Sequence, residues 1–448
     1  MSDLLSIGAS GVKAYQSALT TVSENIANAN VTGYARRTTD LKEIGAPAGV
    51  LATNKNLAGG GVIAGGVVRS ADEYASNAVR SSGADLARTA TGVNWLDRID
   101  SVMAGNQLNE RVTGFFNAAR TLASDPTSTA LRSNMLGAAT STATAFTATG
   151  AAFTQAADDL DTMARASVDT LQRLGQSLAK VNDGLGRAAS GSSAAANLSD
   201  QRDQLLEQMS ALVDVDSKLD PIGRATVTLG GKSGPLFVSG KTVGALGYEQ
   251  TSDGVPAFTV TMDGRESSLT ANGGALAGTV DGAQKLATAR ATLDTIAGEF
   301  TDRMNTIQTG GDDQTGKPGT ALFATGDRPT DISVVITDPR GIAAASTGGG
   351  VRNSGNLSAI DAARTAGGFE TGITALITGN ATTLKQRQTI ADAQGAIRDG
   401  AVAMRDSATG VNLDTEAVEL MRFQQAYSAS SRVISVARDI FQTLIDIR

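Results

Sequence analysis

The chain has 448 residues, a net charge of −7, and neither cysteine nor histidine. Without cysteine it can form no disulfide, zinc–thiolate site, iron–sulfur cluster or thiol nucleophile. Without histidine it lacks the commonest general base, the commonest transition-metal ligand and any Ser-His-Asp triad. The acidic balance argues against nucleic-acid binding, and the apolar runs are far shorter than the roughly 20 residues that span a bilayer. Catalysis would have to depend on carboxylates, lysine, tyrosine or a phosphate-binding loop.

The first 29 residues predict a long helix. Two apolar rows with a seven-residue period run along residues 4–29: Leu5, Val12, Leu19 and Ile26 in one, and Gly8, Tyr15, Val22 and Ala29 in the other. This is the a/d pattern of a coiled coil. Within the same stretch only Lys13 and Glu24 are charged, so the helix lacks the charged outer face of a solvated helix. We therefore expect it to be surrounded by other helices.

After this helix the chain is rich in asparagine and glycine. Asn28, Asn30 and Gly33 precede Tyr34 and a pair of arginines. Asparagine and glycine at a helix end provide left-handed caps and side-chain hydrogen bonds to the backbone. We expect the helix to turn sharply here into an extended chain, and its amides to be available to neighbouring subunits.

The C-terminal segment has the same seven-residue period. Its rows are Leu413, Leu420, Tyr427, Ile434 and Phe441, and, offset by three, Glu416, Phe423, Ser430, Ala437 and Leu444. Asn412 or Asp414 is a suitable N-cap. The two terminal helices have matching periods and could pair with each other. The alternative is that each packs on an ordinary intramolecular core.

Between the termini, helical spacing dominates residues 75–220, including 95–103, 110–123, 129–146 and 155–182, and resumes at 284–309 and 357–406. Residues 225–280 instead alternate short β-type runs with turns such as Asp253-Gly254 and Asp263-Gly264. We predict a mainly α fold with a small inserted β domain. The terminal helices pair as a coiled coil (1–45 and 405–448), a split helical bundle forms the body (46–220 and 281–404), and an antiparallel β domain lies outside (221–280).

Two motifs imitate sites of chemistry. Residues 311–317 match G-x4-G-K, but Pro318 replaces the magnesium-binding Ser or Thr, and the loop follows a helix rather than a strand. Asp158, Asp159 and Asp161 could be taken for hard-metal ligands. Next to Gln155 and Arg165 they are better explained as a solvated helix face. We therefore predict no catalytic residue, no metal site and no cofactor.

Several segments resemble a known family. Residues 17–37, SALTTVSENIANANVTGYARR, and residues 410–444 resemble the two characteristic ends of the bacterial flagellar axial proteins, which form rod, hook and hook-associated structures. The middle segments 115–132, 197–215 and 293–323 are similar to the family of hook-associated protein 1. Two departures are a glutamine, Gln308, near a place where that family commonly carries histidine, and a shorter β region.

The resemblance implies a structural subunit at the junction of hook and filament, exported unfolded by the flagellar type III system to an extracellular position. It implies as partners other copies in a ring, hook protein, hook-associated protein 3, and an export chaperone that binds the C-terminal region, with neither nucleic acid nor membrane. The alternatives are another axial protein (hook protein or hook-associated protein 3) or an axial protein with a hydrolytic insert. The expected assembly interface comprises Leu5, Val12, Tyr15, Leu19, Val22, Ile26, Asn28, Asn30, Gly33, Tyr34, Leu413, Leu420, Phe423, Tyr427, Ile434, Phe441 and Leu444.

Overall fold

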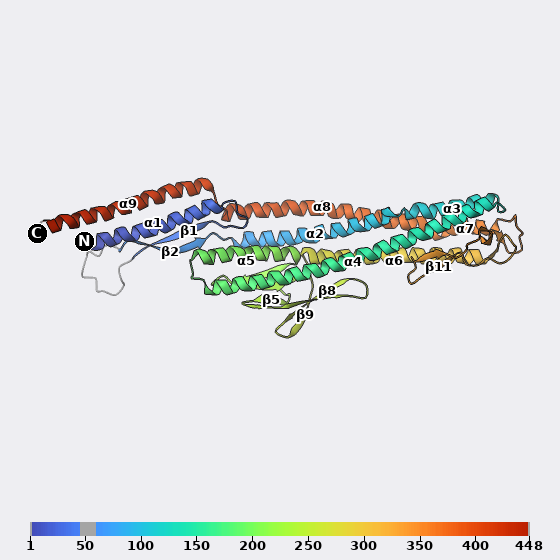
Figure 1. The fold of residues 1–448 in the computed structure, drawn as a ribbon, viewed down its shortest axis with the longest axis horizontal. Helices are drawn as coiled ribbons and strands as arrows, with labels where there is room; N and C mark the ends of the chain where they lie inside the picture. Colours follow the sequence, from blue (N-terminus) through green and yellow to red (C-terminus); the bar gives the residue numbers. More distant parts are fainter. Residues whose placement is uncertain (1, 45–59, 447–448) are drawn as a thin grey trace.

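The protein is an elongated assembly of long helices in a computed structural model that describes residues 2–44 and 60–446 (Figure 1). Helices α1 (Ser2–Asn28) and α9 (Leu413–Asp446) lie side by side at one end, with both chain termini. The helical body extends from this pair to the opposite end, and small antiparallel sheets flank it. The predicted fold class, mainly helical with a small β region and paired terminal helices, is confirmed. In the described residues, no helix combines the length and apolarity that crossing a membrane requires.

Seven helices build the body: α2 (Glu73–Gly105), α3 (Leu108–Ser124), α4 (Thr129–Arg187), α5 (Ser193–Leu212), α6 (Gly274–Thr309), α7 (Gly355–Gly367) and α8 (Phe369–Thr409). Asp72, Ser128 and Ser192 cap the first turns of α2, α4 and α5 by accepting backbone N–H bonds. Helix α2 packs along both α6 and α8. Segments distant in sequence thus share one core, centred on Phe300.

The helical segments expected at 129–146 and 155–182 form one continuous helix, α4. Gly150, which lies between them, is a helix-weakening residue in sequence terms. In the structure Gly150 lies against Thr330, and a Cβ atom at position 150 would come within 2.4 Å of the Thr330 Oγ1 atom. The glycine therefore admits a neighbouring loop without interrupting the helix.

The β region follows α5 and contains two antiparallel sheets. One has the order β3 (Val215–Leu219), β4 (Ala225–Leu229), β5 (Leu236–Ser239), β6 (Thr242–Val243); the other has the order β7 (Ala245–Gln250), β8 (Pro256–Met262), β9 (Arg265–Leu269). Asp263 and Gly264 have φ angles of 51° and 75°, as the predicted two-residue hairpin turn requires. Phe237 of β5 lies against Gly175 of α4, so the sheets share a core with the long helix.

A separate two-stranded sheet connects the terminal helices to the body. Strands β1 (Arg37–Glu43) and β2 (Val62–Arg69) form an antiparallel ladder along α1, which the sequence did not predict. Gly66, with a φ of 135°, lies so close to Gly191 that a side chain would clash there, and the Val67 N–H donates to the Gly191 carbonyl at 2.6 Å. The ladder is thereby attached to the turn between α4 and α5.

The remaining short elements cap the opposite end of the body: β10 (Gly311–Asp312) with β13 (Ala345–Ser346), β11 (Phe323–Thr325) with β12 (Ile332–Val334), and the 3-10 helix η1 (Pro339–Gly341). The phosphate-loop imitation lies here, after α6, as expected. Its backbone N–H groups at Thr315 and Lys317 donate to the Asp313 carboxylate. An internal carboxylate therefore takes the donors that a phosphate would need.

Candidate functional site: the terminal helix pair and its polar junction

The outer part of the α1–α9 contact is made by small residues. A Cβ atom at Gly8 would lie 2.7 Å from Ile434 Cγ1, and one at Gly11 would lie 2.6 Å from the Ser430 hydroxyl. Glycine at both positions lets the two helices approach closely. Gly8, Tyr15 and Val22 of the second predicted row all face α9, whereas Leu19 is the member of the row starting at Leu5 that packs on the contact.

The inner part of the contact is aromatic and aliphatic. The rings of Tyr15 and Phe423 lie 6.4 Å apart, and Val22 is buried beside Phe423. Leu19 and Leu420 pack on the same cluster. The structure therefore brings together five of the residues predicted from the two heptad patterns.

Other predicted residues are exposed or only half-buried in the described structure. Leu413 and Phe441 are 52% and 58% exposed, and Leu5 and Ile26 are also exposed. The remaining apolar positions of the two rows are half-buried: Val12, Tyr427 and Ile434. The side chain of Leu444 lies outside the described part of the chain. The pair thus covers one face of α9 and leaves another uncovered.

The turn after α1 has the predicted sharp form. Asn28 donates to the Glu24 carbonyl at 2.9 Å, and Gly33 has a φ of 78°, which favours glycine. Asn30 is exposed. The Tyr34 hydroxyl donates to the side chain of Asn25 at 2.9 Å, and burial raises the Tyr34 pKa despite the nearby Arg37 guanidinium.

A buried carboxylate joins α9 to this turn. Glu416 has no exposed surface; it accepts from Arg36 Nε at 2.6 Å and from Asn25 Nδ2 at 2.9 Å. Asn25 also bonds the backbone carbonyl and N–H of Arg37. Asn25, Arg36 and Glu416 were not among the predicted site residues. A charge at an apolar heptad position was the available signal for Glu416.

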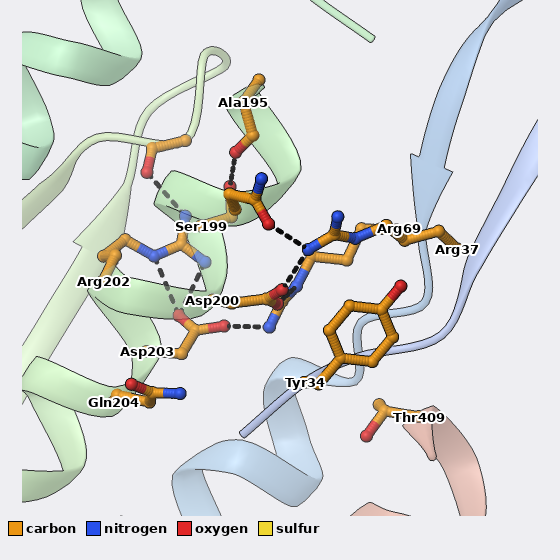
Figure 2. Close-up of polar contacts among 12 residues, drawn as sticks. Tyr34, Arg37, Arg69, Ala195, Ser199, Asp200, Arg202, Asp203, Gln204 and Thr409 are labelled. Carbon is orange, nitrogen blue, oxygen red and sulfur yellow. Dashed lines mark hydrogen bonds and ion pairs between the residues drawn. The ribbon is translucent and has the colours of Figure 1, made fainter. Parts of the chain in front are cut away.

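The junction with the body is an arginine–aspartate cluster (Figure 2). Asp200 of α5 accepts from Arg37 at 2.7 Å and from Arg69 at 2.5 Å. Arg69 also pairs with Asp203 at 2.7 Å, and Asp203 pairs with Arg202. Burial lowers the pKa of Arg69, but the carboxylates of Asp203 and Asp200 outweigh it, so that pKa lies above its usual value. The cluster fixes the β1–β2 ladder to α5.

A groove of about 860 Å³ lies at the same junction. Its walls are the turn at residues 29–35, α5, and the C-terminal part of α8. Gln204 of α5 closes one side by donating to the Thr32 carbonyl at 2.9 Å. We call this feature the elbow groove, because it lies where the terminal pair meets the body.

The aspartates that could be taken for metal ligands have partners within the protein. Asp161 pairs with Arg165 at 2.8 Å and also accepts from the Tyr248 hydroxyl, while Asp159 pairs with Arg98 at 3.0 Å. The described residues contain no group of three or more acidic side chains placed to hold a metal ion. What the site offers is therefore helical surface and a polar junction, not a constellation of reacting groups.

The protein is a helical rod in which the terminal helices pair and leave apolar side chains of α9 exposed. Such an architecture is typical of a structural protein that makes its contacts through helix surfaces. Three family models match parts of this rod: the helical domain of flagellar hook-associated protein FlgK at residues 96–323, the basal body rod protein model at residues 5–34, and the C-terminal model of the rod FlgEFG proteins at residues 405–447. The chain belongs to the FlgK family of flagellar hook-associated proteins.

Individual relatives agree with this assignment. Flagellar hook-associated protein 1 of Escherichia coli K12 is 26% identical in an alignment that covers 100% of both chains. Its counterpart in Salmonella typhimurium is 29% identical over 73% of this chain and 60% of its own length. The flagellar hook junction protein FlgK of Burkholderia pseudomallei has the same fold, with a TM-score of 0.50 and 21% identity over 56% of this chain and 47% of that one.

Proposed function

We propose that the protein is a structural subunit at the junction of flagellar hook and filament, located outside the cell and without enzymatic activity. Copies join into a ring in which α1 and α9 form the inner layer and the β region (221–280 in the predicted division) faces outward. Hook protein and hook-associated protein 3 are the neighbours on either side. Membership in the FlgK family and the open face of α9 support this proposal.

The open face of α9 is the observation that carries the proposal. At helical spacing, its exposed apolar residues are Val418, Met421, Val433, Val436 and Ile440; Leu413, Phe441 and Ile445 are also exposed, but on the side of the helix that carries Phe423. Among the described residues, the α1–α9 pair buries five apolar side chains, and three of these are alanines: Ala14, Ala18, Val22, Phe423 and Ala437. Burial stabilises by about 25 cal/mol per Å² of apolar surface, so contacts with several copies would supply what one pair lacks.

The same property fits an exported subunit. A pair with so small a core has little to offset its ordering entropy before assembly, which suits passage through a type III channel in unfolded form. In the cytoplasm the exposed apolar row of α9 would need a cover. An export chaperone bound to the C-terminal region provides one.

The variant Val436→Asp tests the proposal. Val436 is 57% exposed, so the substitution leaves the α1–α9 contact intact; Leu420, which packs on the pair's own core, would disturb it. We expect unchanged helix content and melting temperature in the free protein, and loss of incorporation into flagella of cells that lack the native copy. The reason is that a carboxylate would be buried unpaired between copies.

Ser435→Asp is the matched control. Ser435 is the neighbouring residue, is also exposed, and lies beside the charged positions 432 and 439 at helical spacing. We expect this variant to assemble. Normal flagella with Val436→Asp would overturn the proposal that this face of α9 is buried between copies.

A further inference from the structure

The elbow groove contains a buried cation that lacks an acidic partner. Arg80 of α2 is 7% exposed. Its Nη2 atom donates to the Asn77 side chain, and its Nε atom has no hydrogen-bond partner. Throughout residues 2–44 and 60–446, no carboxylate oxygen lies within 4.0 Å of the Arg80 nitrogens. A buried guanidinium is normally paired, because an unpaired one bears its desolvation cost alone.

The carboxylates nearby are already used by other arginines. Both oxygens of Asp200 bind Arg37 and Arg69. Both oxygens of Asp203 bind Arg69 and Arg202. Glu24 also lies 3.7 Å from Arg37. The guanidinium groups of Arg37, Arg69, Arg80 and Arg202 thus face three carboxylates, and the cluster lacks one negative charge.

The electrostatic balance at Arg80 agrees with this count. Burial lowers the pKa of Arg80, and the neighbouring Arg202 lowers it further. The carboxylates of Asp203, Glu73 and Glu207 act in the opposite direction without restoring the usual value. Glu207 is itself paired, with Arg405 at 3.0 Å.

Arg80 is accessible to a ligand that enters from outside. It lines both the elbow groove and an adjoining cavity of about 230 Å³. The groove also contains Asp203, Glu207 and Asp406, whose charges would repel a dianion. A single carboxylate matches these walls better than a phosphate, because one negative charge suffices for one unpaired guanidinium.

We propose that the elbow groove receives an aspartate or glutamate side chain of a second copy of this chain, which pairs with Arg80. The inference rests on the proposed function. A copy is the favoured source because this chain has seven more acidic than basic residues. In addition, α8 exposes Ile397 and Met404, 63% and 64%, beside the groove-lining Arg398 and Arg405. The groove is therefore next to an apolar surface that a copy can cover.

The variant Arg80→Met separates this role from a structural one. Methionine keeps an unbranched apolar stem and removes the charge. If Arg80 pairs with a carboxylate only after assembly, the unassembled Arg80→Met protein should be as stable as the parent or more stable, since the variant lacks an unpaired buried charge. Incorporation into flagella should fall at least about tenfold, the effect of one lost charge-assisted hydrogen bond. Arg80→Lys, which keeps a charge, should retain part of the incorporation.

Arg173→Met is the matched control, because Arg173 is exposed on α4 and, within the described residues, its side chain bonds the Thr170 hydroxyl alone. Normal incorporation of Arg80→Met would overturn the inference, and so would a strongly destabilised free Arg80→Met protein. The source of the carboxylate is identified by comparing the melting temperature in sodium acetate with that in sodium chloride of equal ionic strength. Protection of the parent but not of Arg80→Met, together with normal incorporation of Arg80→Met, would assign the groove to a free carboxylate and overturn the role of a copy. Failure of the proposed function would appear differently, as normal assembly of Val436→Asp.

Discussion

The helical body and the terminal pair are built from similar helices but differ in what covers them. In the body, α3, α4, α6, α7 and α8 enclose a continuous core in which six phenylalanine rings surround or include Phe300. In the described part of the pair, the five buried apolar residues include three alanines, and large apolar side chains remain on the surface. The body carries its own core, whereas the pair depends on its polar junction and on further contacts.

This difference shows how one chain can combine a stable body with a conditional assembly element. A free-standing core makes the body independent of partners. Under the proposed function, the two-helix pair gains most of its stabilising burial from contacts with other copies. Three substitutions test this difference between the helical body and the terminal pair.

The largest effect is expected from Phe300→Ala. Phe300 is fully buried, and its ring lies 5.5 Å from those of Phe115, Phe323 and Phe369. The cavity should lower the free energy of unfolding by about 3–5 kcal/mol, measured by chemical denaturation. Phe441→Ala, at a residue of α9 that is 58% exposed, should change it by less than about 0.5 kcal/mol. Equal effects would mean that the pair already has a core comparable to that of the body.

An intermediate effect is expected from Glu416→Gln, which removes the buried charge opposite Arg36. The loss of this charge-assisted bond should weaken the pair by about 1–3 kcal/mol. In the free parent protein we expect amides of α1 and α9 to exchange faster than those of the body, and the variant should accelerate them further. Exchange in α4 and α6 should not change. Acceleration throughout the chain would show that pair and body unfold as one unit.

The smallest effect is expected from Glu370→Gln in the body. Hydrogen bonds from Arg364 hold the pKa of Glu370 below its usual value, against the opposing effect of burial, and Thr113 contributes a further bond. Because the folded state binds this proton less readily than the unfolded state, the stabilisation is present above the unfolded pKa of about 4.5 and is lost as pH falls through the folded value. The contribution of the Arg364–Glu370 ion pair to the free energy of unfolding should be under about 1 kcal/mol, since both side chains are partly exposed. Melting curves between pH 6 and pH 3 should fall less steeply for the variant; identical slopes would contradict this assignment.

Much of the fold was predictable because local patterns agree with it. The heptads of residues 4–29 and 413–444, the β runs after residue 221 and the Asp263-Gly264 turn all appear where expected. The β1–β2 ladder was not predicted, because its second strand, VIAGGVVR, contains two glycines and is positioned by Gly191 rather than by its own pattern. The named segments 129–146 and 155–182 lie in a stretch expected to be helical, and α4 is continuous between them although it contains Gly150.

The sequence by itself determined the helical rod, the position of the β region and the family, since periodicity and local motifs suffice for these. Only the tertiary structure decided where α1 approaches α9 most closely, which is at Gly8 and Gly11. It also decided that Glu416 is enclosed by Asn25 and Arg36, and that Arg80 is left without a carboxylate. Those relations join residues tens to hundreds of positions apart, and a charge in a sequence does not reveal which partners the packing will place beside it.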